Sequence, residues 1–260
     1  MTDDPEVLID GHPPTLAALA RFAVVNDGHF TAMQVRRGAV RGLGLHLERL
    51  HAAHRALYGT SLDVDGLRRL LRAVIAVHPD ASLRVTVAEP DPGHPAVLTA
   101  VRPPIEPESN PRPMRLTVVE WVRGVPGIKH VGTFPQIQYA RQARAAGFDD
   151  AVLVDAAGGI AEATTANIAF ARGDGIVWPA GPALPGITWR LLDRALPAAG
   201  IPSRTRPIGL RHLTGFDGAV LVNSVGIVPV AAIAGHEFPR SAEVARHLDA
   251  VYRAVPAEAV

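Results

Sequence analysis

The basic residues of this chain are almost all arginine. Of its 26 lysine and arginine residues, only Lys129 is a lysine. Arginine can replace a solvated lysine, but a guanidinium stays charged up to about pH 12 and cannot act as an amine nucleophile. A buried lysine can lose its proton and attack a carbonyl carbon. Lys129 is therefore the best candidate for a Schiff-base residue, and the alternative is one surface lysine that survived by chance.

A Schiff-base lysine that works with pyridoxal phosphate (PLP) needs partners for the phosphate and for the pyridine nitrogen. Residues 184–188 (LPGIT) are predicted to open a helix, and the unpaired first-turn amides of Ile187 and Thr188 would suit a phosphate. The pyridine nitrogen calls for a carboxylate. Several acidic residues lie within forty positions of the lysine, and the residues alone do not choose among them: Glu120, Asp149, Asp150, Asp155 and Glu162.

Composition excludes several other classes of protein. The chain is 48% hydrophobic and 20% charged with a net charge of +1, which is typical of a globular protein and favours neither nucleic acid nor an anionic membrane as a partner. No run of apolar residues is long enough for a membrane helix. The absence of cysteine excludes disulfides and thiolate metal sites, the histidines form no ligand cluster, and we expect no metal. The acidic N-terminus lacks the pattern of a signal peptide, so we expect a cytoplasmic protein.

Proline divides the chain. Residues 102–113 contain five prolines and no apolar periodicity, as expected of a stiff linker. We therefore predict a small N-terminal α/β domain over 1–103, a linker over 104–113 and a larger domain over 114–260. Apolar spacing predicts the elements of the first domain: a hairpin of strands 30–35 and 39–45, helices over 46–58 and 63–78, and strands over 83–88 and 96–101. Gly59 is predicted to end the first of these helices, and Asp63 is placed to cap the second.

The second domain is predicted to mix strands with helices. A glycine-rich loop, 124–132, carries the lysine and follows the first strand. Residues 172–175 (RGDG) read as a hairpin turn. The predicted elements are a strand over 114–121, a helix over 135–146, short strands within 151–178, a helix from 187 to about 198, strands within 219–233, and a helix over 241–255.

Ordered motifs along residues 25–235 carry a resemblance to a known family. They are HLERL at 46–50, Lys129, ARAAGFDD at 143–150, GGIAE at 158–162, NIAF at 167–170, LPGIT at 184–188, and NS at 223–224 with VPV at 228–230. In this order and spacing they resemble the class IV aminotransferases, PLP enzymes of fold-type IV that include branched-chain and D-amino acid aminotransferases and aminodeoxychorismate lyases. The resemblance implies a mixed α/β fold of two domains with the cofactor site between them.

The resemblance also implies roles for individual residues. Lys129 would form the Schiff base and move the proton between the substrate Cα and the cofactor. Glu162 would pair with the pyridine nitrogen. The phosphate would be held by Arg49, the amides of Ile187 and Thr188, and Ser224. Weaker candidates for substrate contacts are Arg84, His29 and Thr31.

One departure from the family pattern bears on the chemistry. Phe134 stands where the family usually has a tyrosine that donates a hydrogen bond to the phenolic oxygen of the cofactor. The first-domain motif around residues 25–31 is also altered. Both changes are compatible with cofactor binding, and both argue against the standard amino-acid substrates of the family.

We interpret the chain as a PLP-dependent aminotransferase that moves an amino group between a small-molecule amino donor and a keto acceptor, and the resemblance implies a homodimer. Two alternatives stay open. One is an aminodeoxychorismate lyase-like elimination enzyme using the same cofactor, and the other is a degenerate PLP-binding protein without activity.

Overall fold

The computed structural model describes residues 4–260 and divides the chain into two compact units. The first unit contains the chain up to residue 106 together with Ile128–Gly132 and Pro256–Val260. The second contains Pro107–Gly127 and Thr133–Val255. The first unit therefore combines segments that are far apart in the sequence, and the second is interrupted only by residues 128–132. The division predicted around the prolines uses continuous segments.

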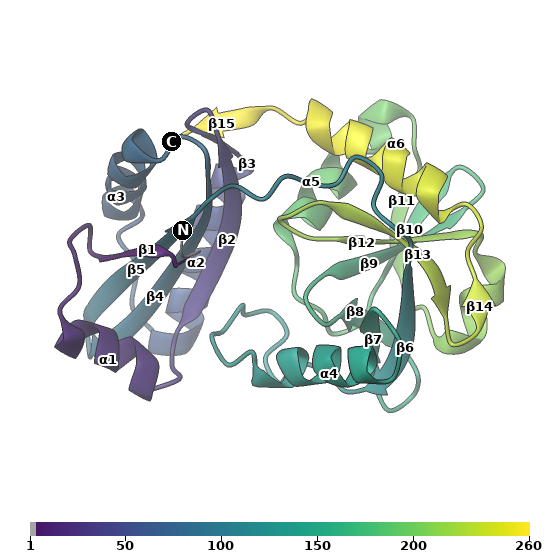
Figure 1. The fold of residues 1–260 in the computed structure, drawn as a ribbon, viewed down its shortest axis with the longest axis horizontal. Coiled ribbons are helices and arrows are strands. Elements are labelled where there is room, and N and C mark those ends of the chain that lie inside the picture. Colours follow the sequence, from purple (N-terminus) through teal and green to yellow (C-terminus); the bar gives the residue numbers. More distant parts are fainter. Residues whose placement is uncertain (1–3) are drawn as a thin grey trace. The chain divides into compact units, whose positions relative to one another are not determined.

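The first unit is built on a six-stranded antiparallel sheet in the order β1-β5-β4-β2-β3-β15 (Figure 1). Its edge strand β15 comes from the C-terminal segment and pairs with β3. The elements are β1 (Glu6–Ile9), α1 (Leu16–Val24), β2 (His29–Arg36), β3 (Ala39–Arg41), α2 (Leu43–Tyr58), α3 (Val64–Val77), β4 (Ala81–Asp91), β5 (His94–Arg102) and β15 (Ala257–Ala259).

Helices α2 and α3 share one apolar core with this sheet. On β2, alternate residues such as Met33 and Val35 enter that core, as the period of a half-buried strand requires. Asp63 caps α3 by accepting a hydrogen bond from the Gly66 amide at 2.9 Å, which confirms the predicted cap. Gly59 ends α2 with a φ of 73°, a conformation that glycine adopts without strain.

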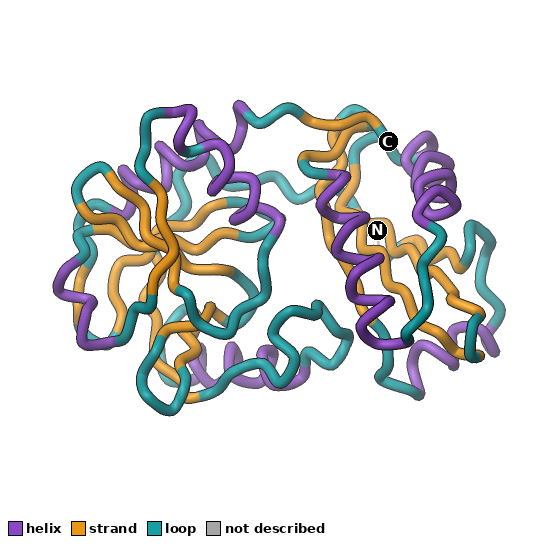
Figure 2. Tube along the Cα trace, turned by 180° about the vertical axis from the view of Figure 1, so that it is seen from behind, coloured by secondary structure: helices purple, strands orange, loops and turns teal. Residues whose placement is uncertain are grey.

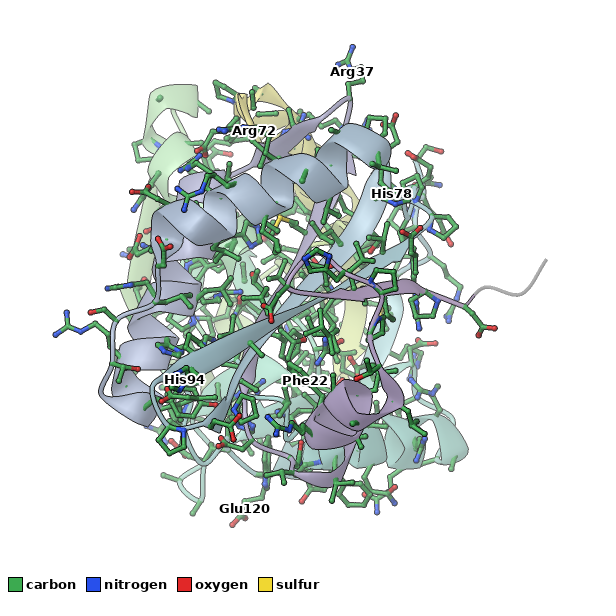
Figure 3. All side chains as sticks on the ribbon, turned by 90° about the vertical axis from the view of Figure 1, so that its left-hand side faces the viewer. Phe22, Arg37, Arg72, His78, His94 and Glu120 are labelled. Carbon is green, nitrogen blue, oxygen red and sulfur yellow. The ribbon has the colours of Figure 1, made fainter. Side chains whose placement is uncertain are left out.

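The predicted hairpin is confirmed, but its second strand is shorter than expected. It ends at Arg41 because α2 already begins at Leu43. Arg37, in the turn, has a φ of 50°, and its amide donates to Asp80 Oδ1 at 3.1 Å. Its side chain projects away from the ribbon in Figure 3. Helix α1 and strands β1 and β15 were not predicted.

The second unit is built on a nine-stranded mixed sheet. Eight strands follow the order β11-β10-β9-β12-β13-β6-β7-β8, and β14 pairs with β13. Figure 2 shows strands in orange and helices in purple. The elements are β6 (Met114–Glu120), α4 (Phe134–Ala145), β7 (Asp150–Val154), β8 (Ile160–Ala163), β9 (Asn167–Arg172), β10 (Gly175–Pro179), α5 (Ile187–Ala195), η1 (Pro197–Ala199), β11 (Ser203–Arg206), η2 (Leu210–Gly215), β12 (Gly218–Val222), β13 (Ile227–Ile233), β14 (His236–Glu237) and α6 (Ser241–Ala254).

The central strands of this sheet are buried on both faces. On β9, Ile168 and Phe170 enter one apolar cluster while Ala169 and Ala171 enter another. Helix α6 lies along β12 and β13 on the side of the second cluster (Figure 1). Strands covered on both faces read as continuous apolar runs, which is why the sequence of this region shows little alternation. No helix within residues 4–260 is long and apolar enough to cross a membrane.

Candidate active site

The segment that carries Lys129 is held by strand β2 of the first unit. The Phe30 amide donates to the Lys129 carbonyl at 2.8 Å, and the Val131 amide donates to the Gly28 carbonyl at 2.9 Å. These two bonds make an antiparallel bridge between His29 and His130. Lys129 therefore lies in a segment that the sequence predicts as a loop, but its backbone is hydrogen-bonded as in a short strand.

The Lys129 side chain lies on the same face of β2 as Phe30. Its Nζ atom is 4.7 Å from the centre of the Phe30 ring. The Arg84 guanidinium carbon lies 3.6 Å from the same ring, and Arg84 Nε donates to Thr86 Oγ1 at 3.3 Å. Two cationic groups thus gather around one aromatic ring, an arrangement suited to attracting an anion.

His29 and Thr31 point to the opposite face of β2, toward α2. Thr31 Oγ1 lies 2.6 Å from His46 Nδ1, and both side chains are buried. The His29 ring packs against the ring of His54, with centroids 5.8 Å apart. Burial, followed by the charge of a neighbour, lowers the pKa of His29 to about 4 and that of His46 to about 3. Both rings are therefore neutral at pH 7.

Arg49 lies on α2, one helical turn after His46, and it is partly buried. Its charge is the second cause of the lowered pKa of His46, after burial. The helix that carries Arg49 is thus fixed to β2 through the contact between His46 and Thr31. Because the segment of Lys129 is bonded to the same strand, the lysine and this arginine share one support.

In the second unit, Glu162 lies on β8 and is 4% exposed. Its Oε1 accepts a hydrogen bond from Arg123 Nε at 3.3 Å, and its Oε2 accepts one from the Leu184 amide at 3.2 Å. Leu184 is the first residue of the segment that leads into α5. A hydrogen bond therefore joins the candidate carboxylate to the loop that precedes α5.

The loop before α5 approaches Asn167 closely. Asn167 Nδ2 donates to the Leu184 carbonyl at 2.8 Å, and a Cβ atom on Gly186 would overlap Asn167 Oδ1. Helix α5 begins at Ile187, so the amides of Ile187 and Thr188 belong to the first turn, which has no helical acceptors. These amides and the positive end of the helix suit an anion.

A second loop lies beside the start of α5. The Thr188 hydroxyl donates to the Asn223 carbonyl at 2.7 Å. Asn223 Oδ1 accepts from the Val225 amide at 2.8 Å, which closes the turn that carries Ser224. The structure therefore brings the predicted phosphate residues Ile187, Thr188 and Ser224 onto two loops joined by one hydrogen bond.

Sequence reasoning missed Arg123 as the partner of Glu162. It did not predict the contact of Gln136 with Arg123. It named Asn223 only as part of the NS motif at 223–224, without its role in building the turn. Arg123 is one among many arginines, and no motif distinguishes it in the sequence. Gln136 is 2% exposed at the start of α4. A fully buried glutamine on a helix of low apolar content has no signature in the sequence, because its partner lies thirteen residues away on a loop.

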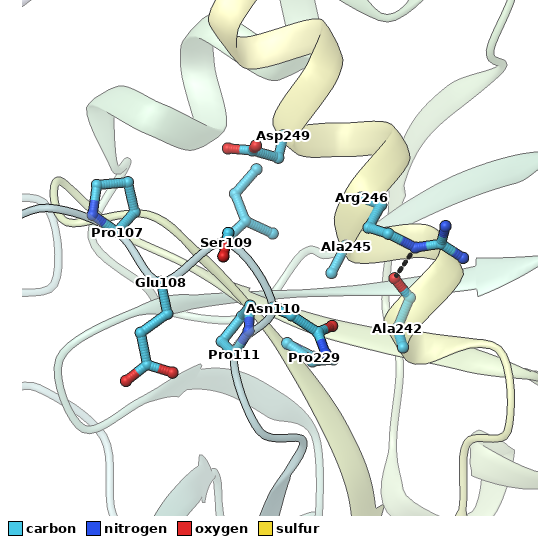
Figure 4. Close-up of a pocket in the computed structure, with 11 residues that line it drawn as sticks. Pro107, Glu108, Ser109, Asn110, Pro111, Pro229, Ala242, Ala245, Arg246 and Asp249 are labelled. Atoms are coloured by element: carbon cyan, nitrogen blue, oxygen red, sulfur yellow. Dashed lines mark hydrogen bonds between the residues drawn. The ribbon is translucent and has the colours of Figure 1, made fainter.

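Other parts of the described chain show no competing site. No group of three or more histidine or acidic residues within residues 4–260 could hold a metal ion. A shallow pocket lies between residues 107–111 and α6, and it is lined by Glu108, Asn110, Arg246 and Asp249 among others (Figure 4). None of its lining residues is among the candidates described above.

Comparison with known proteins decides the family. Residues 28–233 match the family model of class IV amino-transferases. The chain belongs to the class IV aminotransferase family. The matched range contains Lys129, Arg49, Glu162, Ile187, Thr188 and Ser224, and the resemblance read from the motifs is confirmed.

Individual relatives agree with this family. A probable branched-chain-amino-acid aminotransferase of Rickettsia felis is 28% identical over 152 residues, which is 56% of this chain and 51% of that protein, so the match spans about half of the relative. The structure of 4-amino-4-deoxychorismate lyase from Pseudomonas aeruginosa superposes with a TM-score of 0.80 at 27% identity, covering 95% of this chain and 98% of that one. A hypothetical aminotransferase from Mycobacterium tuberculosis, in its PLP-bound form, gives 0.79 at 22% identity, covering 95% and 98%.

These matches confirm the predicted mixed α/β fold of the fold-type IV class. PLP is the expected cofactor of this family member. The donor set fits it: the chain offers a restrained amine at Lys129, a buried carboxylate at Glu162, and a helix start with adjacent hydroxyls. The family contains both aminotransferases and an elimination enzyme, so membership leaves the reaction open.

Proposed function

We propose that the protein is a PLP-dependent aminotransferase that moves an amino group from a small amino acid or amine to a keto acid. The observation that carries the proposal is the restraint of Lys129. The segment of the only lysine is bonded to the start of β2 by two backbone hydrogen bonds, one of them accepted by the Lys129 carbonyl itself. The Lys129 amine lies beside the Phe30 ring, which Arg84 also contacts. A surface lysine that survived by chance has no reason to be held in this way.

Each candidate residue then has a definite task. When bound, PLP supplies an electron sink for negative charge at the substrate Cα. Lys129 Nζ would attach the cofactor, and once the amine of the substrate has displaced it, the freed Nζ would move the Cα proton. Glu162 holds the pyridine nitrogen. The phosphate is held by Arg49, the first-turn amides of Ile187 and Thr188, and Ser224.

The remaining candidates divide according to the face of β2 on which they lie. Arg84, on the same face as Lys129, binds the substrate carboxylate. His29 and Thr31 lie on the other face and contact α2. We therefore propose that these two residues fix the helix that carries Arg49, and that Arg84 recognises the substrate.

The visible absorbance spectrum with added PLP tests this proposal. We expect the wild-type protein to develop a band near the visible region that borohydride fixes covalently, and that changes when a suitable amino donor is added. Lys129→Ala and Lys129→Arg should both lack the band, because guanidinium keeps the charge and loses the nucleophile. A panel of donors should include branched-chain amino acids, given the Rickettsia felis relative. Turnover retained by either variant would refute the assignment of Lys129.

A lyase is the second candidate, and one observation favours it. The Pseudomonas aeruginosa lyase is similar over almost the entire chain. Phe134, which is 68% exposed and supplies no phenol where the family usually has tyrosine, instead motivates the third candidate, a PLP-binding protein without activity. Release of pyruvate from aminodeoxychorismate without a keto acceptor would support the lyase. Amino transfer that depends on a keto acid would support the aminotransferase. If the protein binds PLP but catalyses neither reaction, it is a protein without activity.

We also propose that the protein is a homodimer. Family resemblance is the basis of this proposal, because residues from one subunit would complete the pocket of the other. Sedimentation velocity should then give about twice the 27.5 kDa mass of the chain. A species of 27.5 kDa with full activity would exclude a shared pocket.

A further inference from the structure

Arg123 is buried without belonging to any of the family motifs. It follows β6 and is 6% exposed, and its Nε donates to Glu162 Oε1. Removal of a charged group from water is costly unless the charge is paired and its hydrogen bonds are satisfied. A buried arginine beside the candidate cofactor carboxylate therefore calls for an explanation.

The other end of the Arg123 guanidinium is held by Gln136. With its side-chain oxygen turned toward Arg123, Gln136 accepts from Nη1 at 2.9 Å and from Nη2 at 3.1 Å, while its Nε2 donates to the Thr133 carbonyl at 3.2 Å. All three guanidinium nitrogens thus have partners. Both oxygens of Glu162 have partners as well, since the Leu184 amide donates to the second one.

This network joins three regions that serve the same cofactor. Glu162 is the candidate partner of the pyridine nitrogen, and Leu184 begins the loop before the phosphate-binding end of α5. Arg123 and Gln136 stand at the two ends of the segment 124–135, which carries Lys129. A single side chain, that of Arg123, bonds directly to two of these regions and reaches the third through Glu162.

We propose that Arg123 is a positioning residue that holds Glu162 ionised and oriented toward the pyridine nitrogen of PLP. This rests on the proposed role of Glu162. Without Arg123, the buried carboxylate would lose the positive charge that is bonded to it, and its ionised form would become more costly. Glu162 would then hold the protonated pyridine nitrogen less well, while contacts to the phosphate and to the aldehyde would remain.

The test compares binding of PLP with binding of its 1-deaza analogue, in which carbon replaces the pyridine nitrogen. Both compounds keep the aldehyde and the phosphate. The wild-type protein should prefer PLP, and Arg123→Gln should reduce that preference roughly tenfold, the effect of losing a hydrogen bond to a charged group. Glu162→Gln should do the same, and the double variant should show no further loss, because both residues act on the same atom.

Arg240→Gln is the matched control. Arg240 also pairs with two carboxylates in the second unit, those of Asp217 and Glu243, but it is partly exposed and has no contact with this network. Its replacement should leave the preference for PLP unchanged. Arg123→Lys keeps the charge but cannot reach both Glu162 and Gln136, so it should give an intermediate preference, and it serves if Arg123→Gln does not fold.

Three results would overturn the proposal. Equal losses of affinity for PLP and its analogue in Arg123→Gln would mean that the arginine only supports the fold. An unchanged preference would mean that Glu162 does not depend on Arg123. A wild-type protein that binds both compounds equally would show that Glu162 does not contact the pyridine nitrogen. These binding measurements contain no amino donor, so their outcome does not depend on whether the protein is an aminotransferase. Failure of the aminotransferase proposal is detected separately, in the reactions with amino donors.

Discussion

Replacement of Gly186 by alanine should separate the loop before α5 from Asn167. The backbone of Gly186, with φ −63° and ψ 143°, is open to alanine without strain. By itself the change would stabilise the fold by about 0.4–1 kcal/mol through a less flexible unfolded chain. The new Cβ overlaps Asn167 Oδ1, however, so Asn167 must move and release the Leu184 carbonyl.

Loss of this buried hydrogen bond leaves two polar groups unsatisfied and costs about 1–3 kcal/mol. The net result should be a decrease of about 1–2 kcal/mol in the free energy of unfolding of the apoprotein, measured in urea. PLP affinity should fall as well, because the displaced loop carries the first-turn amides of α5. Gly215→Ala is the matched control, since a Cβ there meets no atom within 4 Å.

A double-mutant cycle with Asn167→Ala tests the reasoning directly. Once the Asn167 side chain is absent, the alanine at position 186 has nothing to displace. Its cost should then nearly vanish, giving an interaction energy of about 1 kcal/mol or more. If Gly186→Ala cost as much in the Asn167→Ala background as in the wild type, steric displacement of Asn167 would not be the cause.

Three further predictions concern the first unit. Thr31→Val removes the partner of buried His46 and should lower the free energy of unfolding by about 1–3 kcal/mol in urea, whereas an unchanged midpoint would contradict the contact. Gly28→Ala places a Cβ atom on a residue with a φ of +148°, 2.9 Å from the Val87 carbonyl oxygen. The free energy of unfolding should decrease by about 1–3 kcal/mol. The pairing of β2 with residues 129–131 should also loosen, and hydrogen exchange at the Val131 amide should become faster. Burial lowers the pKa of His29 from 6.5 to about 4, so between these pH values the unfolded chain binds a proton at His29 that the folded chain does not. The free energy of unfolding should therefore fall by about 3 kcal/mol as the pH decreases from 6.5 to 4. A urea midpoint that stays constant over that range would refute this.

Local elements followed from the sequence because local physics determines them. The cap at Asp63, the stop at Gly59 and the hairpin at residues 172–175 all depend on neighbours a few positions away. Helix α1 was missed because it is short and apolar around most of its circumference, and none of its residues is buried. Strand β15 was missed because three residues give too short a pattern.

The candidate site divides in the same way. Motifs singled out Lys129, Glu162 and the start of α5 as candidates, because these residues match the order and spacing of the family pattern. Spacing could not reveal that His29 and Thr31 face α2, because the face of a strand depends on which side the helices cover. Nor could it reveal the pairing of Arg123 with Gln136, which joins residues across a loop by side-chain geometry alone.

Because the first unit is built from discontinuous segments, its sheet cannot be completed until residues 257–259 have been synthesised. When residues 1–106 have left the ribosome, the sheet has β1 to β5, but neither the segment of Lys129 nor β15 exists yet. Until residues 257–259 arrive, β3 remains an open edge with unpaired backbone groups, and such edges favour association between chains. The nascent protein therefore passes through a stage in which its N-terminal sheet is formed but incomplete, and a fragment ending near residue 106 should aggregate more readily than the entire chain.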